Sequence, residues 1–269
     1  MEVESLTINK SRFVDVSESK LSDPYDFDVS KLRFSELITK TIQGDEGQLP
    51  VKINRIYIGA LYDNNKVGEL LFKLKDELFS FGVVQSNNKY QTSLCLFTKD
   101  APTENQHKFI ATIDRICKKT IQYLVQIKDK IGFYDLCESD LRKINPIWYT
   151  KTNGKPDATK PVLYVKLPQN KYGKITTIFL HNGKEVDVSE LEKIYFMMKN
   201  PVLLLECISI VANKFKIKIV LTETKIKKND GVRKRFNDSS DEETMKPVHL
   251  NDNILEEDDE DARSNYSTD

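Results

Sequence analysis

The sequence has few of the residues from which metal centres and disulfide frameworks are built. Its 269 residues include three histidines, which stand apart at positions 107, 181 and 249, and four cysteines, at 95, 117, 137 and 207. No C-x-x-C spacing occurs, so neither a disulfide framework nor a zinc knuckle is indicated. We expect buried thiols in a reducing compartment and no bound metal or cofactor.

Catalytic signatures are also missing. The chain has no G-x-x-x-x-G-K-[ST], G-x-G-x-x-G, H-E-x-x-H or G-x-S-x-G sequence, each of which would indicate a known chemistry. His107 is ten residues from Cys117 on a predicted helix, too far along the axis to activate that thiol. We therefore expect a protein without enzymatic activity.

Long apolar runs are absent as well. No stretch approaches the roughly 20 apolar residues of a transmembrane helix, and the first residues, MEVESLTINKSRF, have neither an apolar signal region nor an Arg-rich amphipathic pattern. With 39% apolar and 30% charged residues, the chain is neither membrane-spanning nor disordered throughout. These features predict a soluble intracellular protein without a membrane partner.

Charge is present in equal amounts of both signs but is unevenly placed. The formal net charge is zero, yet residues 238–269 contain twelve acidic and two basic residues, a net charge of −10, and residues 1–237 carry +10. Such segregation suggests a nucleic-acid partner with an electrostatic competitor in the same chain, or simply a solubilising tail.

The patterning divides the chain into three parts. Residues 1–30 are predicted to be a flexible arm, 31–228 a single β-rich domain, and 229–269 a disordered tail that is first basic and then acidic. Within the domain, β-branched and aromatic runs separated by Asn, Gly and Asp clusters predict strands. The strands are expected in VKINRIYIGAL, GELLFKL, LFSFGVVQ, KYQTSLCLFT, PIWYTK, PVLYVKL, GKITTIFL, KEVDV, KIYFMMK, VLLLECISIV and KFKIKIVLTETKI.

One long amphipathic helix interrupts these strands. Apolar residues recur at helical intervals over 103–131, and Thr103 and Gln106 have the spacing of a capping box. HNGK at 181–184 predicts a tight hairpin, and ESDLRKI a short helix. The order predicts a mainly β protein of the α+β class, an OB-fold-like (oligonucleotide-binding) barrel with additions; a β-sandwich with an inserted helix fits the same order.

The sharpest candidate site lies near the end of the domain. Lys214, Lys216 and Lys218 alternate with apolar residues, so one strand face would carry three lysines spaced by 6.6–6.8 Å, close to the spacing of phosphates along one strand. The alternative is a solvated face, or an edge that lysines protect against aggregation.

Aromatic and basic residues are also interleaved elsewhere. Arg55 and Lys166 would add phosphate contacts, and Trp148, Tyr149 and Tyr164 are candidate rings on which bases stack, as binding to single strands without sequence preference requires. Any one such ring considered alone more often belongs to the core than to a stacking surface, and Trp148 is the one that we expect to be partly exposed.

Several phrases resemble a known family. VKINRIYIGALYDNNKVGELLFKLKDELFSFGV, YQTSLCLFTKDAPTENQHKFI and PVLYVKL…ITTIF…NGKEVDVSEL…IKIVLTETKIK together resemble a largely uncharacterised protein family of nucleocytoplasmic large double-stranded DNA viruses, over about residues 31–228. The resemblance implies a viral context, in the host cytoplasm, a viral factory or the virion, and carries no catalytic signature.

The layout is also similar to the single-stranded DNA-binding proteins of T7-like phages. The similarity implies a helix-interrupted OB barrel whose acidic tail occupies the binding groove until a nucleic-acid strand displaces it, and then recruits replication proteins. Those tails typically end on an aromatic residue, whereas this chain ends Tyr266-Ser267-Thr268-Asp269, which weakens the recruitment function more than the competition.

Two hypotheses follow. The first is a single-stranded nucleic-acid-binding protein, for DNA with RNA left open, that supports viral replication or recombination. The second is a non-enzymatic structural or assembly protein of a large DNA virus, with a homo-oligomer left open in either case. Basic and aromatic residues gathered in one concave groove would favour the first, and dispersed residues the second.

Overall fold

Two long antiparallel strands organise the molecule, β14 (Phe196–Val211) and β15 (Lys214–Lys228). They pair from Phe196 opposite Lys228 to Val211 opposite Lys214, with bulges along β14. The turn between them uses Ala212 and Asn213 in the left-handed region, at φ 45° and 64°. The computed structural model describes residues 7–8, 20–42, 51–63, 65–86, 89–97, 101–152, 154–192 and 194–228.

Five strands close into a ring of hydrogen-bonded pairs. β7 (Glu77–Ser80) pairs with β9 (Lys89–Cys95), β9 with β11 (Lys155–Leu167), and β11 with β15. The ring is completed by β15 on β14 and by β14 on β7. The β11–β15 pairing is parallel and the other four are antiparallel, so the last strand of the ring lies between its third and fourth strands.

A second group of strands extends the sheet from β14. β5 (Val51–Leu61) and β6 (Val67–Lys73) both pair with β14 and with one another. β3 (Leu32–Ser35) and β4 (Ile38–Ile42) pair with β5, β2 (Leu21–Ser22) with β6, and β1 (Thr7–Ile8) with β3.

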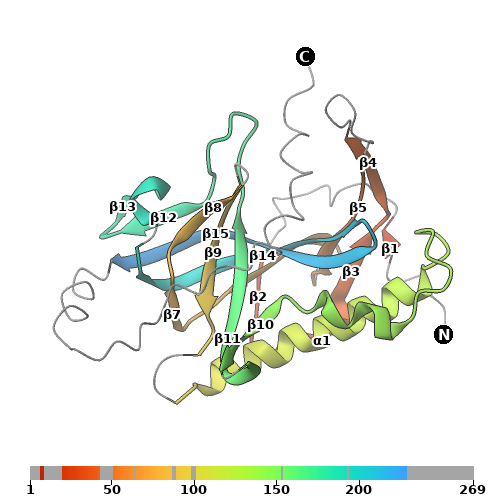
Figure 1. Cartoon of the computed structure of the whole chain (residues 1–269), viewed down its shortest axis with the longest axis horizontal. Coiled ribbons are helices and arrows are strands. Elements are labelled where there is room, and N and C mark those ends of the chain that lie inside the picture. The colour runs from red at the N-terminus through yellow and green to blue at the C-terminus, as the bar shows by residue number, and fades with distance from the viewer. Residues whose placement is uncertain are drawn as a thin grey trace.

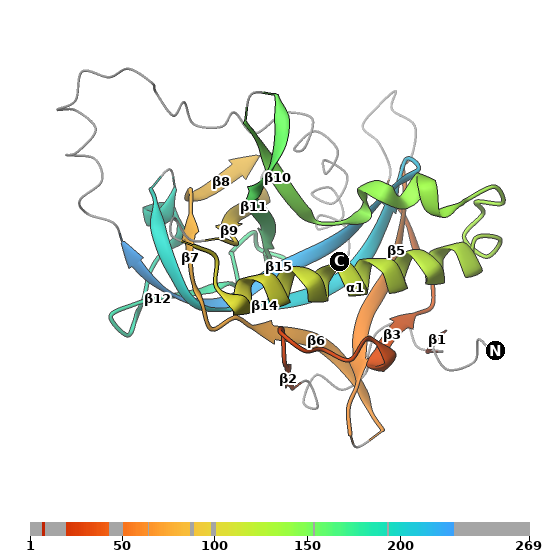
Figure 2. The same cartoon turned by 90° about the horizontal axis from the view of Figure 1, so that it is seen from below.

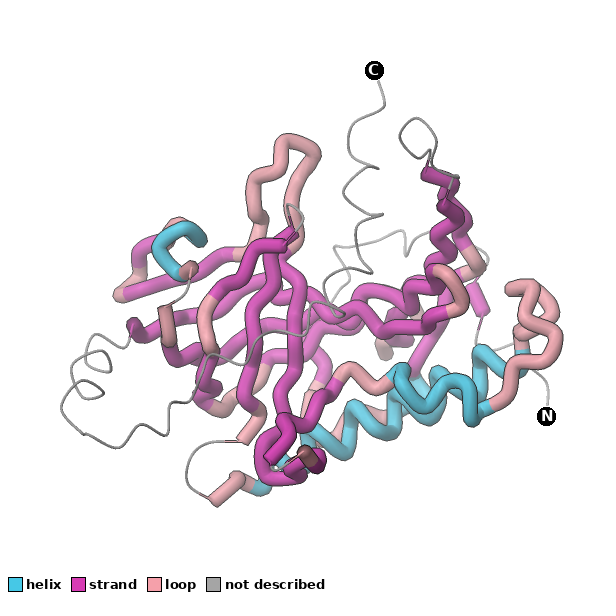
Figure 3. Tube along the Cα trace, viewed as in Figure 1, coloured by secondary structure: helices cyan, strands magenta, loops and turns pink. Residues whose placement is uncertain are grey.

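Shorter elements complete the described chain. They are β8 (Val83–Ser86) on β9, β10 (Ile147–Thr152) on β11, the hairpin of β12 (Ile178–His181) and β13 (Lys184–Glu185), and the 3-10 turns η3 (Val29–Lys31), η4 (Glu138–Ile144) and η5 (Val188–Leu191). Strands form most of the described chain (Figure 3). The predicted β-rich α+β class is confirmed.

The helix α1 (Glu104–Gln126) covers one face of the long strands. It runs below β14 and β15 in Figure 1 and in front of them in Figure 2. Its Tyr123 ring stacks on Phe34 of β3 at 4.2 Å between centroids, and Phe109 meets Phe72 of β6 edge-on. The core therefore lies between the helix and the extended sheet and continues into the ring of strands.

The helix ends earlier than predicted. The capping box is confirmed, since Thr103 accepts the Gln106 backbone N–H and the Gln106 side chain accepts that of Thr103. Residues 127–131, however, form turns after the C-cap at Ile127. The apolar period continued past the true end because Ile127 and Ile131 are buried in those turns.

The predicted arm at residues 1–30 contains core residues. Tyr25 and Phe27 are 7% and 4% exposed, and the Tyr25 hydroxyl accepts the Lys75 backbone N–H and donates to Asp76. Two aromatics among polar residues produce no period, so the pattern could not reveal that this segment packs on β6. Residues 229–269, predicted to be a tail, lie outside the described residues.

The predicted HNGK hairpin is confirmed. His181 pairs with Lys184, and Asn182 and Gly183 adopt φ 51° and 79°. Positive φ at both central residues is the reason that Asn-Gly marks this turn.

Replacing Thr103 by alanine should destabilise the protein by about 1 kcal/mol, since an N-cap side chain contributes about 0.5–2 kcal/mol. The hydroxyl also donates to Asp76, which links the helix to the Tyr25 segment. Urea unfolding measures the change. Thr103→Ser keeps the hydroxyl and should lose much less; equal losses in both variants would contradict the role of the cap.

Candidate nucleic-acid interface

The alternation along β15 places its lysines on the face opposite the helix. Phe215, Ile217 and Ile219 are buried in the core cluster, and the Phe215 ring contacts Phe133, which follows α1. Successive side chains of a strand point to opposite faces. Lys214, Lys216 and Lys218 therefore lie on the outer face, with Lys214 exposed and the other two half-buried.

Strand register extends this positive charge across the sheet. Lys216 faces Ser209 of β14, which faces Arg55 of β5. One row away, Lys218 faces Cys207, which faces Tyr57. Directly paired residues share a face, so the predicted Arg55 lies on the same surface as the predicted lysines.

The central strand contributes small side chains to this surface. Cys207 and Ser209 are only 1% and 6% exposed, because the longer side chains of the neighbouring strands rise beside them. Arg55 and Tyr57 lie on one side and Lys216 and Lys218 on the other. The small side chains of β14 therefore lie beneath the long side chains of β5 and β15, which form the outer surface here.

The outer face continues onto β11. Lys166 pairs with Val220, two residues beyond Lys218 on β15, so both lysines point outward. Tyr164 is two residues from Lys166 and half-buried, and burial raises the pKa of its hydroxyl. A sixth base, Lys40 of β4, lies in the same row as Lys214, as described below. We call these six bases the basic face: Lys40, Arg55, Lys166, Lys214, Lys216 and Lys218.

Of the two remaining predicted rings, one lies on the basic-face side. Trp148 pairs with Val162, which is two residues from Tyr164 and therefore points to the same face of β11. The Trp148 side chain is 51% exposed. Tyr149 pairs with Pro161 and so points to the other side of the β10–β11 hairpin. The structure thus brings together seven of the eight predicted residues and separates Tyr149 from them.

Lys40 was not among the site residues predicted from the sequence. It faces Ile53 of β5, which faces Val211 and then Lys214, and it is exposed. The strands predicted from the sequence begin with VKINRIYIGAL, so β4 was not among them. The alternation of Ile38, Lys40 and Ile42 with threonines is the signal for β4.

The β10–β11 hairpin projects away from α1 (Figure 2). Near its tip, Asp157 accepts hydrogen bonds from Thr159 and Thr152, which hold the pKa of its carboxyl well below the usual range. Lys151 and Lys155 are exposed on the same hairpin. The hairpin therefore carries positive charge beyond the Trp148 ring.

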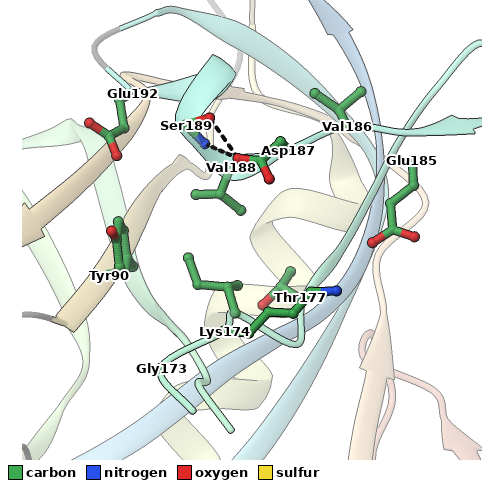
Figure 4. Close-up of a pocket in the computed structure, with 11 residues that line it drawn as sticks. Tyr90, Gly173, Lys174, Thr177, Glu185, Val186, Asp187, Val188, Ser189 and Glu192 are labelled. Atoms are coloured by element: carbon green, nitrogen blue, oxygen red, sulfur yellow. Dashed lines mark hydrogen bonds between the residues drawn. The ribbon is translucent and has the colours of Figure 1, made fainter.

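A cavity of about 220 Å³ near β9 has the wrong charge for this interface. It lies among Tyr90, the 173–177 loop and the segment from β13 to η5 (Figure 4). Its lining includes Glu185, Asp187 and Glu192 against one base, Lys174. Hydrogen bonds from Ser189 lower the pKa of Asp187, so this carboxylate stays charged, and the cavity disfavours a phosphate.

Comparison with known proteins identifies the family. The chain belongs to the family described as Protein of unknown function (DUF2738), whose model matches residues 27–264. The search of curated proteins gave no match. Within the described residues, no helix is long and apolar enough to cross a membrane, and no group of His, Cys, Asp and Glu is arranged to hold a metal ion.

The cysteines should differ in reactivity. Burial raises the pKa of Cys95 and of Cys117 to about 12, and Cys207 is buried, whereas Cys137 is exposed. Because the thiolate is the reactive form, we expect one fast and three slow thiols with Ellman's reagent at neutral pH. Cys137→Ser should remove the fast phase; a fast phase that survives this change would contradict the assignment.

Proposed function

We propose that this protein binds single-stranded nucleic acid, DNA in the first instance, without sequence specificity, and that the basic face is its binding surface. The observation that carries the proposal is that cations from four strands, β4, β5, β11 and β15, converge on one sheet face. Proteins of this class combine a positive surface for the backbone with rings for the bases, and Tyr164 and Trp148 supply such rings beside Lys166.

The proposed fold is an OB-like barrel with additions. Five strands in a closed ring, with the last strand inserted between the third and fourth, support this assignment, since an OB-fold is a five-stranded Greek-key barrel. In such barrels, oligonucleotides bind on the face of the second and third strands, which correspond here to β9 and β11. Tyr164 and Lys166 project from that face.

The acidic tail is proposed to compete for the same surface. Residues 238–269 carry a net charge of −10, against +10 for the rest of the chain. A polyanion in the same chain is held at high effective concentration near a cationic surface. Nucleic acid would displace the tail, which would then be free to meet replication proteins.

The biological setting is also proposed. The resemblance to a protein family of large nucleocytoplasmic DNA viruses supports a role in coating strands exposed during viral replication or recombination, in the host cytoplasm or a viral factory. Coating requires no catalysis, which agrees with the missing enzyme motifs in the sequence.

Neutralising two lysines of the basic face should weaken binding and reduce its salt dependence. For single strands, each phosphate contact contributes about −0.7 to the slope of log K against log salt. Lys216→Gln/Lys218→Gln should therefore reduce the slope by about 1.4. Fluorescence anisotropy of a labelled thymidine oligonucleotide at several salt concentrations measures both quantities.

The matched control is Lys118→Gln/Lys130→Gln. Both residues are exposed on or just after α1, on the opposite side of the sheet, and the double variant has the same net charge. It should bind almost as the unaltered protein does. Equal losses in the two double variants would show that only net charge matters, and binding that is independent of salt would overturn the proposal.

Removing residues 238–269 should strengthen binding at low salt, because a competing segment with a net charge of −10 is lost. The gain should shrink as salt rises, since screening weakens the tail's contact with the basic face. The same titration, with the two chain lengths compared, measures the effect. A full-length variant with Glu256, Glu257, Asp258, Asp259, Glu260 and Asp261 changed to amides should show much of the gain; no gain in either protein would remove the tail from the mechanism.

A further inference from the structure

Three aromatic rings meet on the outer surface at one end of the barrel. Phe79 lies in β7, Phe81 directly after it, and Tyr195 directly before β14. Ring centroids are 5.5 Å apart for Phe79 and Phe81, 5.7 Å for Phe79 and Tyr195, and 6.1 Å for Phe81 and Tyr195. Phe81 is 40% exposed and Tyr195 39%. We call these residues the aromatic cluster.

The backbone around Phe81 is fixed in a way that keeps its ring outside. Gly82 has φ 105°, a conformation that side-chain-bearing residues rarely adopt, and it separates β7 from β8. The Ser93 hydroxyl accepts the Phe81 backbone N–H, and the Ser80 hydroxyl accepts that of Gly82. Thr92 donates to the Gly82 carbonyl, so the kink is held by buried hydrogen bonds.

This arrangement leaves apolar area in water. Burying a Phe side chain is favourable, whereas the kink holds Phe81 partly exposed beside Tyr195. Hydroxyl groups hold the Phe81–Gly82 backbone, and the Phe81 ring is in contact with the rings of Phe79 and Tyr195. The Phe81 ring stands at 87° to Phe79 and at 75° to Tyr195, so a flat aromatic ligand would stack on the face of one ring and meet the edge of another.

The aromatic cluster continues the proposed interface. Phe79 pairs with Cys95 of β9, which pairs with Val162 of β11, which pairs with Trp148 of β10. Direct partners share a face, so Phe79 and Trp148 lie on one outer row that crosses four strands. At 4.7–4.9 Å per strand, the row is about 14 Å long, and Tyr164 stands one row away, opposite Ser93.

Charge near the aromatic cluster is compatible with a nucleic-acid strand. On the other side of Phe79, the row continues through Met197 to Lys227, which is exposed. The acid of the adjacent row, Glu77, forms an ion pair with Lys199. A backbone phosphate next to a stacked base would therefore meet a cation at Lys227.

We propose that Phe81 and Tyr195, supported by Phe79, form a second base-stacking platform, at the end of the row opposite Trp148. The ligand is an unpaired nucleobase of the same strand whose phosphates contact the basic face. This inference rests on the proposed function and adds to it the path of the strand, across β10, β11, β9 and β7.

The test compares Phe81→Ala/Tyr195→Ala with the unaltered full-length protein. The probes are a thymidine oligonucleotide and an abasic oligonucleotide of equal length, which keeps the phosphates and removes the bases. Stacking contributes about 1–3 kcal/mol per base, so the double variant should bind the thymidine oligonucleotide about 5- to 150-fold more weakly, with an unchanged salt slope. Its affinity for the abasic oligonucleotide should not change.

Two control variants isolate stacking. Tyr172→Ala removes a ring that is 80% exposed and lies outside the row, and it should have no effect. Phe81→Tyr/Tyr195→Phe keeps both rings and should restore binding. An equal loss with both probes, or a loss also with Tyr172→Ala, would overturn the platform.

Photocrosslinking tests the unaltered protein directly. A bromouracil oligonucleotide should crosslink to peptides that contain Phe81 or Tyr195; crosslinks confined to other peptides would contradict the inference. If the unaltered protein does not bind the thymidine oligonucleotide at low salt, the proposed function itself fails. If it binds and the double variant binds equally well, only the platform fails. A concentration-dependent dimer that the double variant abolishes without oligonucleotide would assign the aromatic cluster to contacts between copies.

Discussion

The pairing of β14 with β15 is the constraint on which both halves of the molecule depend. β14 pairs with β15 along one edge and, in succession, with β5, β6 and β7 along the other. The same two strands therefore close the ring of five strands at one end and carry the extended sheet at the other. Because register fixes which side chains share a face, this pairing also decides which residues form the basic face.

The sheet accommodates the like charges of the basic face because each lysine and arginine side chain combines a long apolar stem with a charged end. Lys214 is exposed and Lys216 and Lys218 are half-buried, as expected of side chains whose stems lie along the sheet and whose charged ends face water, whereas the Nε atom of Arg55 is buried. Because side chains alternate along β15, the opposite face carries Phe215, Ile217 and Ile219, which are buried in the core on the side of the helix. A single pattern therefore supplies core stability and a cationic surface.

Much of this was readable from local sequence patterns, and some of it was not. The alternation in KFKIKIV predicted the lysine face, and the capping box and Asn-Gly turn were found because their chemistry lies within a few residues. Convergence of Arg55 with Lys216 depends on pairing across about 160 residues of chain, which no local period contains. LFSFGVVQ was predicted as one strand, and the positive φ of Gly82 breaks it into two and exposes Phe81. Tyr25 and Phe27 were missed because isolated core aromatics have no period.

On the proposed binding surface, most of the cations and the exposed rings lie on different strands, and this separation bears on the selectivity that the proposal implies. The positive charge is concentrated on β4, β5 and β15, whereas the exposed rings lie on β10, near Tyr164 of β11, and beside β7. The carboxylates of an acidic tail can pair with the cations, but they cannot stack on the aromatic rings. A nucleic-acid strand can satisfy both at once, so its advantage over the tail would come from its unpaired bases. A duplex, whose bases are stacked internally, would lack that advantage, and this difference gives a physical reason for a preference for single strands.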